Sequence, residues 1–216
     1  MIRLEPPNAR YQASFLLGAA EFAAENQSDL TYAPGLGYGG MRLERHFEHF
    51  VRDLIALGSG RSSAGRYYAD HVLWLLDDSE YVGQVSIRPE LATGFLITYG
   101  GHVGYSIRPS RRGRGYGRRI LGLSLPVARQ LGLRRVLVTC NADNHASRRI
   151  IEANGGRMEI ALRMSPQALA LEKRDPNERL DKLRFWIDLE ALEAEVVDQA
   201  GRTVGPATGA SGPVDG

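Results

Sequence analysis

Glycine and arginine alternate in a short segment near the middle of the chain, between Pro109 and Ile120. The segment reads Arg112-Gly-Arg-Gly115-Tyr-Gly-Arg118. Glycines let a backbone approach a ligand closely, and the first turn of a helix carries unpaired N–H groups with a partial positive charge. Arginine adds a planar, fixed cation that suits phosphate. If a helix begins near Gly115, the segment is predicted to hold a phosphate or pyrophosphate.

Two common phosphate motifs do not fit this spacing. A dinucleotide fingerprint needs G-x-G-x-x-G, whereas these glycines stand at 113, 115 and 117, and a P-loop needs a lysine that the segment lacks. The run also resembles an arginine- and glycine-rich RNA-binding segment with an interleaved aromatic side chain. Such segments are usually disordered and repeated, and this one is single and lies between periodic strand and helix patterns. An RNA-binding module is therefore the disfavoured alternative.

Acidic residues are absent from the surroundings of this loop. Residues 91–142 contain no Asp or Glu and nine arginines, so a charge of +9 in this segment leaves −7 for the rest of the chain, against a total of +2. A near-neutral chain thus has a strongly basic middle. This distribution favours an anionic ligand at the glycine-rich loop.

An alternating order of helices and strands must position the loop. Apolar periodicity and turn residues predict strands at Ile2–Leu4, Tyr67–Leu76, Tyr81–Ile87, His102–Ile107, Arg135–Cys140, Met158–Leu162 and Leu183–Leu189. Helices are expected at residues 8–26, 41–57, 115–131 and 144–153, and irregular chain at 88–99 and 165–181. We expect one domain over residues 1–190 and an extension over 191–216. The extension should be disordered from about residue 200, where Gly, Ala, Thr and Pro prevail.

Composition narrows the class of protein. With 43% hydrophobic and 24% charged residues, the 216-residue chain is typical of soluble globular proteins. No apolar stretch approaches the ~20 residues of a membrane span, and the N-terminus lacks the pattern of a signal peptide. The single cysteine, Cys140, cannot form an internal disulfide. These features predict a cytoplasmic protein without membrane contact. Because the sequence has no cluster of side chains with metal-ligand spacing, we expect no bound metal.

The pattern Arg112-x-x-Gly115-x-Gly117 resembles the acetyl-CoA signature of the GNAT N-acetyltransferases. Downstream, Asn144 precedes an expected helix and Ser147 follows it by three positions, as in that superfamily. A glycine pair at 155–156 closes the helix. The stretches around residues 100–109 and 138–144 are especially similar to a bacterial branch of predicted acetyltransferases of unassigned substrate. The resemblance covers residues 2–190 approximately, and it implies an α/β (α+β) fold with a central mixed, mostly antiparallel, splayed sheet flanked by helices.

The resemblance also implies where acetyl-CoA, as co-substrate, would bind. Backbone groups of Ser106 and Ile107 would pair with the pantetheine arm, the loop would hold the pyrophosphate, and Asn144 would contact the arm near the thioester. The implied cofactor-binding residues are Ser106, Ile107, Arg112, Gly113, Arg114, Gly115, Tyr116, Gly117, Arg118, Asn144 and Ser147. Backbone N–H groups of the splayed strand would polarise the thioester carbonyl.

The implied activity is acetyl-CoA-dependent transfer of an acetyl group to a primary amine of a small molecule, a metabolite or an antibiotic, by direct transfer. Two alternatives remain open: acetylation of a protein or peptide amine, and a GNAT domain that binds CoA without catalysis. The expected partner is the amine acceptor, and a homodimer is left open as an assembly.

The acid and base of well-known members are missing from this sequence. A Tyr that often follows the conserved Asn by seven residues is Ile151 here, and a Glu on the preceding strand is Thr139. A thiol with a pKa of about 8.5 leaves tolerably without an acid. For the base, His102 is attractive, because its ordinary pKa is near 6.5 and it lies on the cofactor strand. Glu90 is the second candidate, and a structural histidine and a surface carboxylate are the plainer interpretations.

Overall fold

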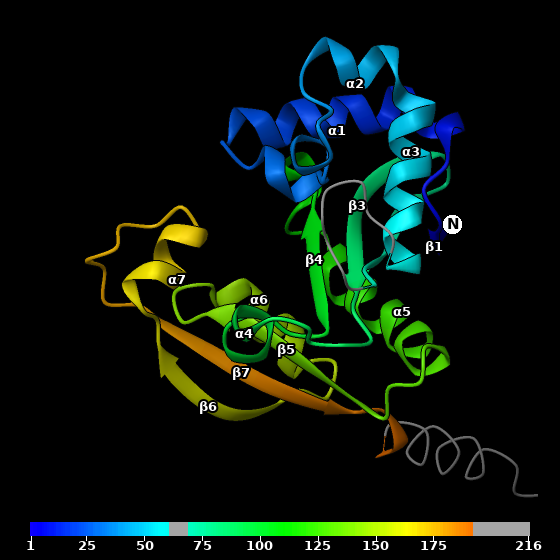
Figure 1. Cartoon of the computed structure of the whole chain (residues 1–216). Coiled ribbons are helices and arrows are strands. Elements are labelled where there is room, and N and C mark those ends of the chain that lie inside the picture. Colours follow the sequence, from blue (N-terminus) through cyan, green and yellow to red (C-terminus); the bar gives the residue numbers. More distant parts are fainter. Residues whose placement is uncertain (61–68, 192–216) are drawn as a thin grey trace, which may run out of the picture.

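Two antiparallel sheets form the framework of the residues that the computed structural model describes, 1–60 and 69–191. The first sheet has the order β1-β2-β3-β4, and the second has the order β5-β7-β6. Their strands are β1 (Ile2–Glu5), β2 (His71–Asp77), β3 (Glu80–Ile87), β4 (Val103–Ile107), β5 (Arg135–Asn141), β6 (Arg157–Arg163) and β7 (Asp181–Asp188). In Figure 1, β3 and β4 stand nearly upright while β5, β6 and β7 sweep across the lower part of the molecule.

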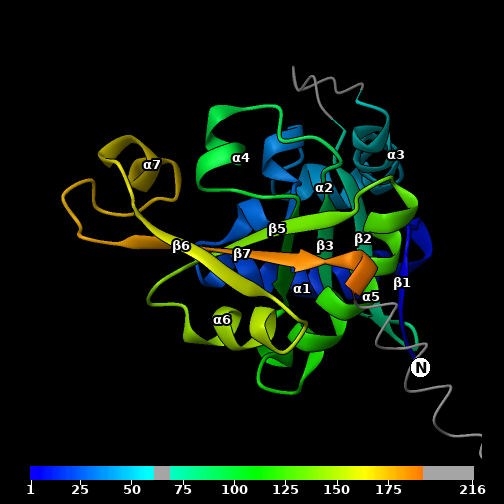
Figure 2. The ribbon, with the colours of Figure 1, turned by 90° about the horizontal axis from the view of Figure 1, so that it is seen from below.

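The helices divide between the two faces of the first sheet. They are α1 (Gln12–Ala24), α2 (Met41–Arg45), α3 (Phe47–Ala56), α4 (Gly94–Thr98), α5 (Tyr116–Gln130), α6 (His145–Glu152) and α7 (Pro166–Leu171). Helices α1 and α3 cover one face, where Phe15 is stacked on Trp74 of β2 with ring centroids 4.7 Å apart. Helix α5 packs on the other face, against Leu75, Val85 and Ile87. Figure 2 shows β5, β6 and β7 from below, with α5 and α6 on one side of them.

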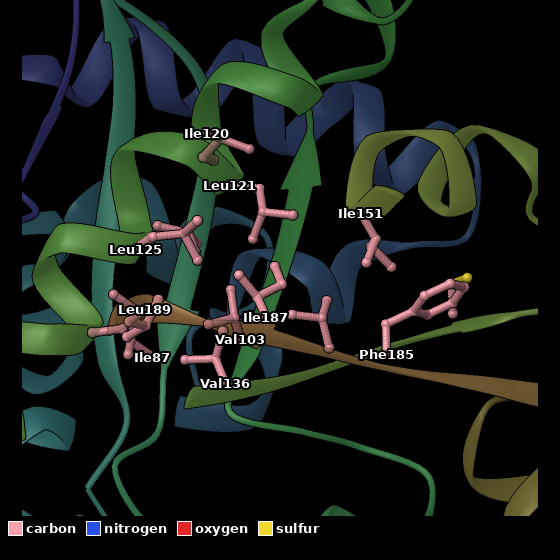
Figure 3. Packing of buried hydrophobic residues seen from close by; sticks show 14 of the residues in the cluster. Ile87, Val103, Ile120, Leu121, Leu125, Val136, Ile151, Phe185, Ile187 and Leu189 are labelled. Atoms are coloured by element: carbon pink, nitrogen blue, oxygen red, sulfur yellow. The ribbon is translucent and has the colours of Figure 1, made fainter. Parts of the chain in front are cut away.

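One apolar core joins the two sheets. Figure 3 shows Leu121 and Leu125 of α5 directed toward Val103 of β4 and Ile187 of β7. Ile151 of α6 belongs to the same cluster. Helix α5 therefore fixes β4 relative to the second sheet, although the two sheets are separate. Burial of this kind contributes roughly 1.5–3 kcal/mol for each large side chain.

The expected mixed α/β fold with splayed, largely antiparallel strands is confirmed, and three local expectations differ from the structure. The single helix expected over 41–57 is two helices, because His46 leaves helical geometry at φ −121° and ψ 34°. Residues 88–99 and 165–181 were expected to be irregular, but they contain α4 and α7. Both short helices begin at a capping side chain, Thr93 or Ser165, that accepts a backbone N–H. The start of the strand expected at Tyr67, and the C-terminal tail, lie outside the described residues.

Across residues 1–60 and 69–191, none of the helices is both long enough and apolar enough to cross a membrane.

Candidate functional site

Strands β4 and β5 meet at one point and then separate. The backbone N–H of His102 donates to the Leu137 carbonyl at 2.8 Å, and the Leu137 N–H donates to Nδ1 of His102 at 2.9 Å. Beyond this junction the two strands belong to different sheets and diverge (Figure 1). Gly101 permits the close approach, since a Cβ there would lie 2.5 Å from the Leu137 carbonyl oxygen. The split between β4 and β5 is the centre of the candidate site.

His102 links the two sheets, and we call its pair of hydrogen bonds with Leu137 the joint. The side chain is only 9% exposed, and its ring centroid lies 5.9 Å from that of Trp186. Burial, and secondly the charge of Arg88, hold the pKa of His102 below its usual value. The Nδ1 lone pair is already engaged by Leu137, so this nitrogen is not available as a base. Glu90, the second candidate base, is exposed in the turn that follows β3.

The edge of β4 that faces the split carries backbone groups of alternate residues. The Arg108 N–H donates to Val82 of β3, and residues two apart on a strand point their N–H and C=O groups to the same side. Gly104 and Ser106 therefore pair with β3, whereas Tyr105 and Ile107 present their groups to the split. Of the two residues expected to pair with the pantetheine arm, Ile107 has its backbone groups on this edge, where its carbonyl accepts from Arg112 Nε at 3.1 Å, and Ser106 has them toward β3. Tyr105 is the second residue with its backbone groups on this edge.

The glycine-rich loop ends at the first turn of α5. Gly113 and Gly115 have φ values of +74° and +80°, which L-residues adopt only with strain, and nothing lies within 4 Å of a Cβ built on either. Gly115 is the N-cap of α5, and the first backbone bond of the helix runs from Arg119 to Gly115 at 3.2 Å. The preceding N–H groups, of residues 116–118, accordingly have no partner within the helix. The loop thus offers backbone donors next to two glycines whose Cα atoms border open space.

Gly117 is required for another reason. A Cβ at this position would lie 2.5 Å from Cδ1 of Ile150 on α6. The absence of a side chain at Gly117 therefore lets α5 and α6 pack closely.

Three arginines of the basic segment are bound to acids from distant parts of the chain. Arg108 pairs with Glu21 at 2.6 Å, and Arg111 pairs with Glu80 at 2.5 Å. The side chain of Arg112, which is expected at the pyrophosphate, pairs with Glu25 at 2.8 Å and donates to Gln27. These contacts fasten the loop to α1 and β3.

Two other arginines keep their charge available. Arg114 and Arg118 are exposed at the loop and in the first turn of α5, and neither forms a salt bridge with an acid of the described residues. Tyr116, between them, points away: its hydroxyl donates to Asp77 of β2 at 2.7 Å, which leaves only its backbone N–H at the loop. The local positive charge is therefore carried by Arg114 and Arg118.

Helix α6 closes the other side of the split. Asn144 caps it, with the side-chain oxygen accepting the Ser147 N–H at 3.0 Å. The Ser147 side chain lies beside the hydroxyl of Tyr105, which reaches from β4 toward α6, and burial raises the pKa of Tyr105 to about 12. The first turn of α6, with Asn144 and Ser147, thus lies beside the side chain of Tyr105. Tyr105 was not singled out from the sequence, although it shares a face of the strand with Val103 and Ile107.

Cys140 of β5 is buried nearby, and it is not an activated nucleophile. Burial raises the pKa of its thiol to about 11, a shift that Lys182 and Arg148 only partly offset. At neutral pH the side chain is a neutral thiol.

The sequence matches a family model, described as an acetyltransferase (GNAT) domain, over residues 22–157. A search among curated proteins finds no match to the chain.

Solved structures with the same arrangement include RimJ of Mycobacterium smegmatis in complex with CoA-disulfide, at 21% identity and a TM-score of 0.58, covering 93% of this chain and 90% of that one. RimL, a ribosomal L7/L12 α-N-protein acetyltransferase in complex with coenzyme A, has 16% identity and a TM-score of 0.57, with 87% and 93% covered. The microcin C7 self-immunity acetyltransferase MccE, in complex with acetyl-CoA and AMP, has 14% identity and a TM-score of 0.56, with 87% and 92% covered.

Because these structures are only 14–21% identical to the chain, they are evidence for its fold alone. The family model, in contrast, spans more than half of the sequence and includes the glycine-rich loop, β4, β5 and α6. The chain belongs to the GNAT acetyltransferase family and is an N-acetyltransferase.

Proposed function

We propose that this N-acetyltransferase takes its acetyl group from acetyl-CoA, held in the split between β4 and β5 and at the glycine-rich loop. The observation that carries the proposal is the loop: the backbone N–H groups of residues 116–118 have no partner within α5, and no acid of the described residues neutralises the neighbouring Arg114 and Arg118. Helix N-termini of this kind bind phosphate groups through those N–H groups and the helix dipole.

The pantetheine arm of acetyl-CoA would fit the open edge of β4. Backbone groups of Tyr105 and Ile107 would pair with the amides of the pantetheine arm as an added strand would. The Tyr105 N–H would also be available to polarise the thioester carbonyl, a preorganised donor that acts without reorganisation. The thioester supplies an activated acetyl group, and the chain's own residues orient it.

The acceptor that we propose is a primary amine of a small molecule, a metabolite or an antibiotic, attacked directly without an acetylated enzyme. Cys140, with its protonated and buried thiol, is unsuited to carry the acetyl group, which favours direct transfer. Structures of the same fold include a microcin self-immunity enzyme and a ribosomal-protein acetyltransferase, so peptide amines are the second acceptor class to test.

Charge reversal at the loop tests the donor site. Arg114→Glu and Arg118→Glu should each raise the Kd of acetyl-CoA at least tenfold in calorimetry, because a phosphate contact to a charged group is worth about 1.5–3 kcal/mol. Arg45→Glu is the matched control: it makes the same change at an exposed residue of α2, on the α1 side of the sheet, and should leave the Kd within twofold. An equal effect of all three variants, or none, would refute the loop assignment.

The acceptor class is tested by turnover. Purified protein with acetyl-CoA is offered a panel of free amines and of peptides with free N-termini, and acetylated products are identified by mass spectrometry. Acetylation of amines but not of peptides supports the proposal, acetylation of N-termini alone supports the peptide alternative, and tight acetyl-CoA binding without any product supports a binding domain.

A further inference from the structure

A buried polar cluster lies on the face of β3 and β4 opposite α5. It consists of Tyr32, Asp70, Ser86 and Arg88, which we call the Tyr32 cluster. Arg88 Nη1 donates to Oγ of Ser86 at 2.8 Å, and the Tyr32 hydroxyl donates to Oδ2 of Asp70 at 3.0 Å. The Ser86 hydroxyl lies beside that of Tyr32, and Arg88 Nη1 lies 3.6 Å from Asp70. The four side chains therefore form a chain of donors and acceptors that ends on a carboxylate.

The cluster lies directly over the split. Ser86 is paired with Gly104 in the register of β3 and β4, and a Cβ on Gly104 would lie 3.0 Å from Nη2 of Arg88. Arg88 Nε also donates to the Gly101 carbonyl at 3.0 Å, next to the joint at His102. Gly104 is adjacent to Tyr105, whose backbone faces the split. The absence of a side chain at Gly104 brings the cluster onto β4.

Tyr32 and Asp70, the last two groups of this hydrogen-bonded series, differ in their exposure to solvent. Asp70 is 1% exposed, whereas Tyr32 is only partly buried. Of the two residues, Tyr32 is therefore the more exposed to solvent. Tyr32 has a φ of +65°, a strained conformation for a residue with a side chain. Strain of this kind persists where the surroundings enforce it.

Helices α5 and α6 pack on the opposite face of the sheet, so we place the acceptor on the face that carries the Tyr32 cluster. We propose that Tyr32 removes the proton from the acceptor amine and that Asp70 is the positioning residue that orients the phenol and takes its proton. This inference rests on the proposed function, since it assigns the missing base of that reaction.

The proposed step is balanced as follows. The amine nitrogen attacks the thioester carbon, the N–C bond forms, and the C–S bond breaks with its electron pair leaving on sulfur. The amine proton moves to the phenol oxygen of Tyr32 while the phenol proton moves to Oδ2 of Asp70. The proton is later released from Asp70 to water, and the thiolate is a stable leaving group at neutral pH. Burial raises the pKa of Tyr32, so the phenol is protonated and donates to Asp70 before the reaction.

The test compares two tyrosines that each donate to a carboxylate at 3.0 Å. Tyr32→Phe removes the proposed base and keeps the ring. Tyr11→Phe is the matched control, because the Tyr11 hydroxyl donates to Glu5 of β1, at the opposite edge of the sheet from β4. Probes are spermidine, kanamycin and hexapeptides beginning with Ser, Thr or Ala, each with acetyl-CoA. Positioned proton transfer is worth about 10²–10⁴-fold, so Tyr32→Phe should lower kcat at least 10²-fold, with acetyl-CoA affinity within twofold of wild type.

Asp70→Asn separates positioning from support of the fold. The amide can accept the Tyr32 hydrogen bond but cannot take its proton, so kcat should fall as far as in Tyr32→Phe while the Kd of acetyl-CoA stays unchanged. If either variant retains kcat within twofold of Tyr11→Phe, the inference is wrong and the proposed function stands. A wild type that binds acetyl-CoA but acetylates no probe also overturns the inference. A wild type that does not bind acetyl-CoA overturns the proposed function.

Discussion

The joint at His102 gives the sharpest separation between a structural and a catalytic histidine. His102→Ala removes the acceptor of the buried Leu137 N–H, whose hydrogen bond to Nδ1 is 2.9 Å long. An unsatisfied buried donor costs about 1–3 kcal/mol, and the lost contact with Trp186 adds to this. We therefore expect a loss of roughly 2–3 kcal/mol. For a chain of this length, 1 kcal/mol corresponds to about 2–4 °C, so Tm should fall by about 4–12 °C.

His102→Asn should recover most of this loss, because the Asn side-chain oxygen can replace Nδ1 as the acceptor. The assay is thermal unfolding together with kcat for any acetylated amine, with His49→Ala, an exposed residue of α3, as the control for removal of a histidine. A His49→Ala variant should lie within about 0.5 kcal/mol of wild type.

The pH dependence of stability provides a second measurement on the same variants. Because burial lowers the pKa of His102 in the folded state, the unfolded chain binds this proton more readily. Stability therefore falls as pH drops below about 6.5, the unfolded pKa of histidine. His102→Asn should remove this part of the acid loss. If His102→Asn instead keeps the wild-type Tm and loses turnover as fully as His102→Ala, the imidazole is needed for the reaction and the structural explanation is wrong.

Three further predictions follow from single contacts. Gly117→Ala should destabilise the protein by about 1 kcal/mol through its clash with Cδ1 of Ile150, and Ile150→Val, which lacks that atom, should relieve at least half of the loss in a double-mutant cycle by urea unfolding. Burial acts to raise the pKa of Glu21, but hydrogen bonds from Arg108 and Ser110 lower it to about 2. The stability that ionised Glu21 contributes should therefore be lost as the pH falls from about 4.5 to 2. Glu21→Gln should flatten this part of an acid unfolding curve followed by circular dichroism. Cys140, with a pKa of about 11, should react with a disulfide reagent at pH 7.5 roughly 100-fold more slowly than in the urea-unfolded chain, and comparable rates would contradict its burial.

Elements whose formation depends on neighbouring residues could be predicted from the sequence. The hairpin β2–β3, the strand β4 and the helix that begins after Gly115 follow from apolar alternation, turn residues and glycine. The prediction that the loop binds an anion also rests on residues adjacent in the chain. The break at His46 was not predictable in this way, since the apolar periodicity runs through it.

Contacts between distant residues account for what sequence reasoning missed. The side chain of Arg112, whose place in the motif predicts a phosphate contact, is bound by Glu25, which lies 87 residues earlier in the chain. The Tyr32 cluster likewise joins residues from three segments, and only the register of β3 and β4 brings Ser86 onto Gly104. No window of sequence contains either arrangement, because each depends on how α1 and the following turns fold over the sheet.

The register of β4 explains how one short strand can serve both partners of a transfer reaction. Side chains on a strand alternate between its faces, and backbone groups alternate between its edges. Gly104 therefore meets Arg88 on one face while the side chain of Tyr105 meets Ser147 on the other. A shift of β4 by one residue would turn Tyr105 toward Arg88 and close the backbone groups at the split against β3. The joint at His102 opposes such a shift, because its two hydrogen bonds to Leu137 fix β4 against β5 at the point where the strands separate.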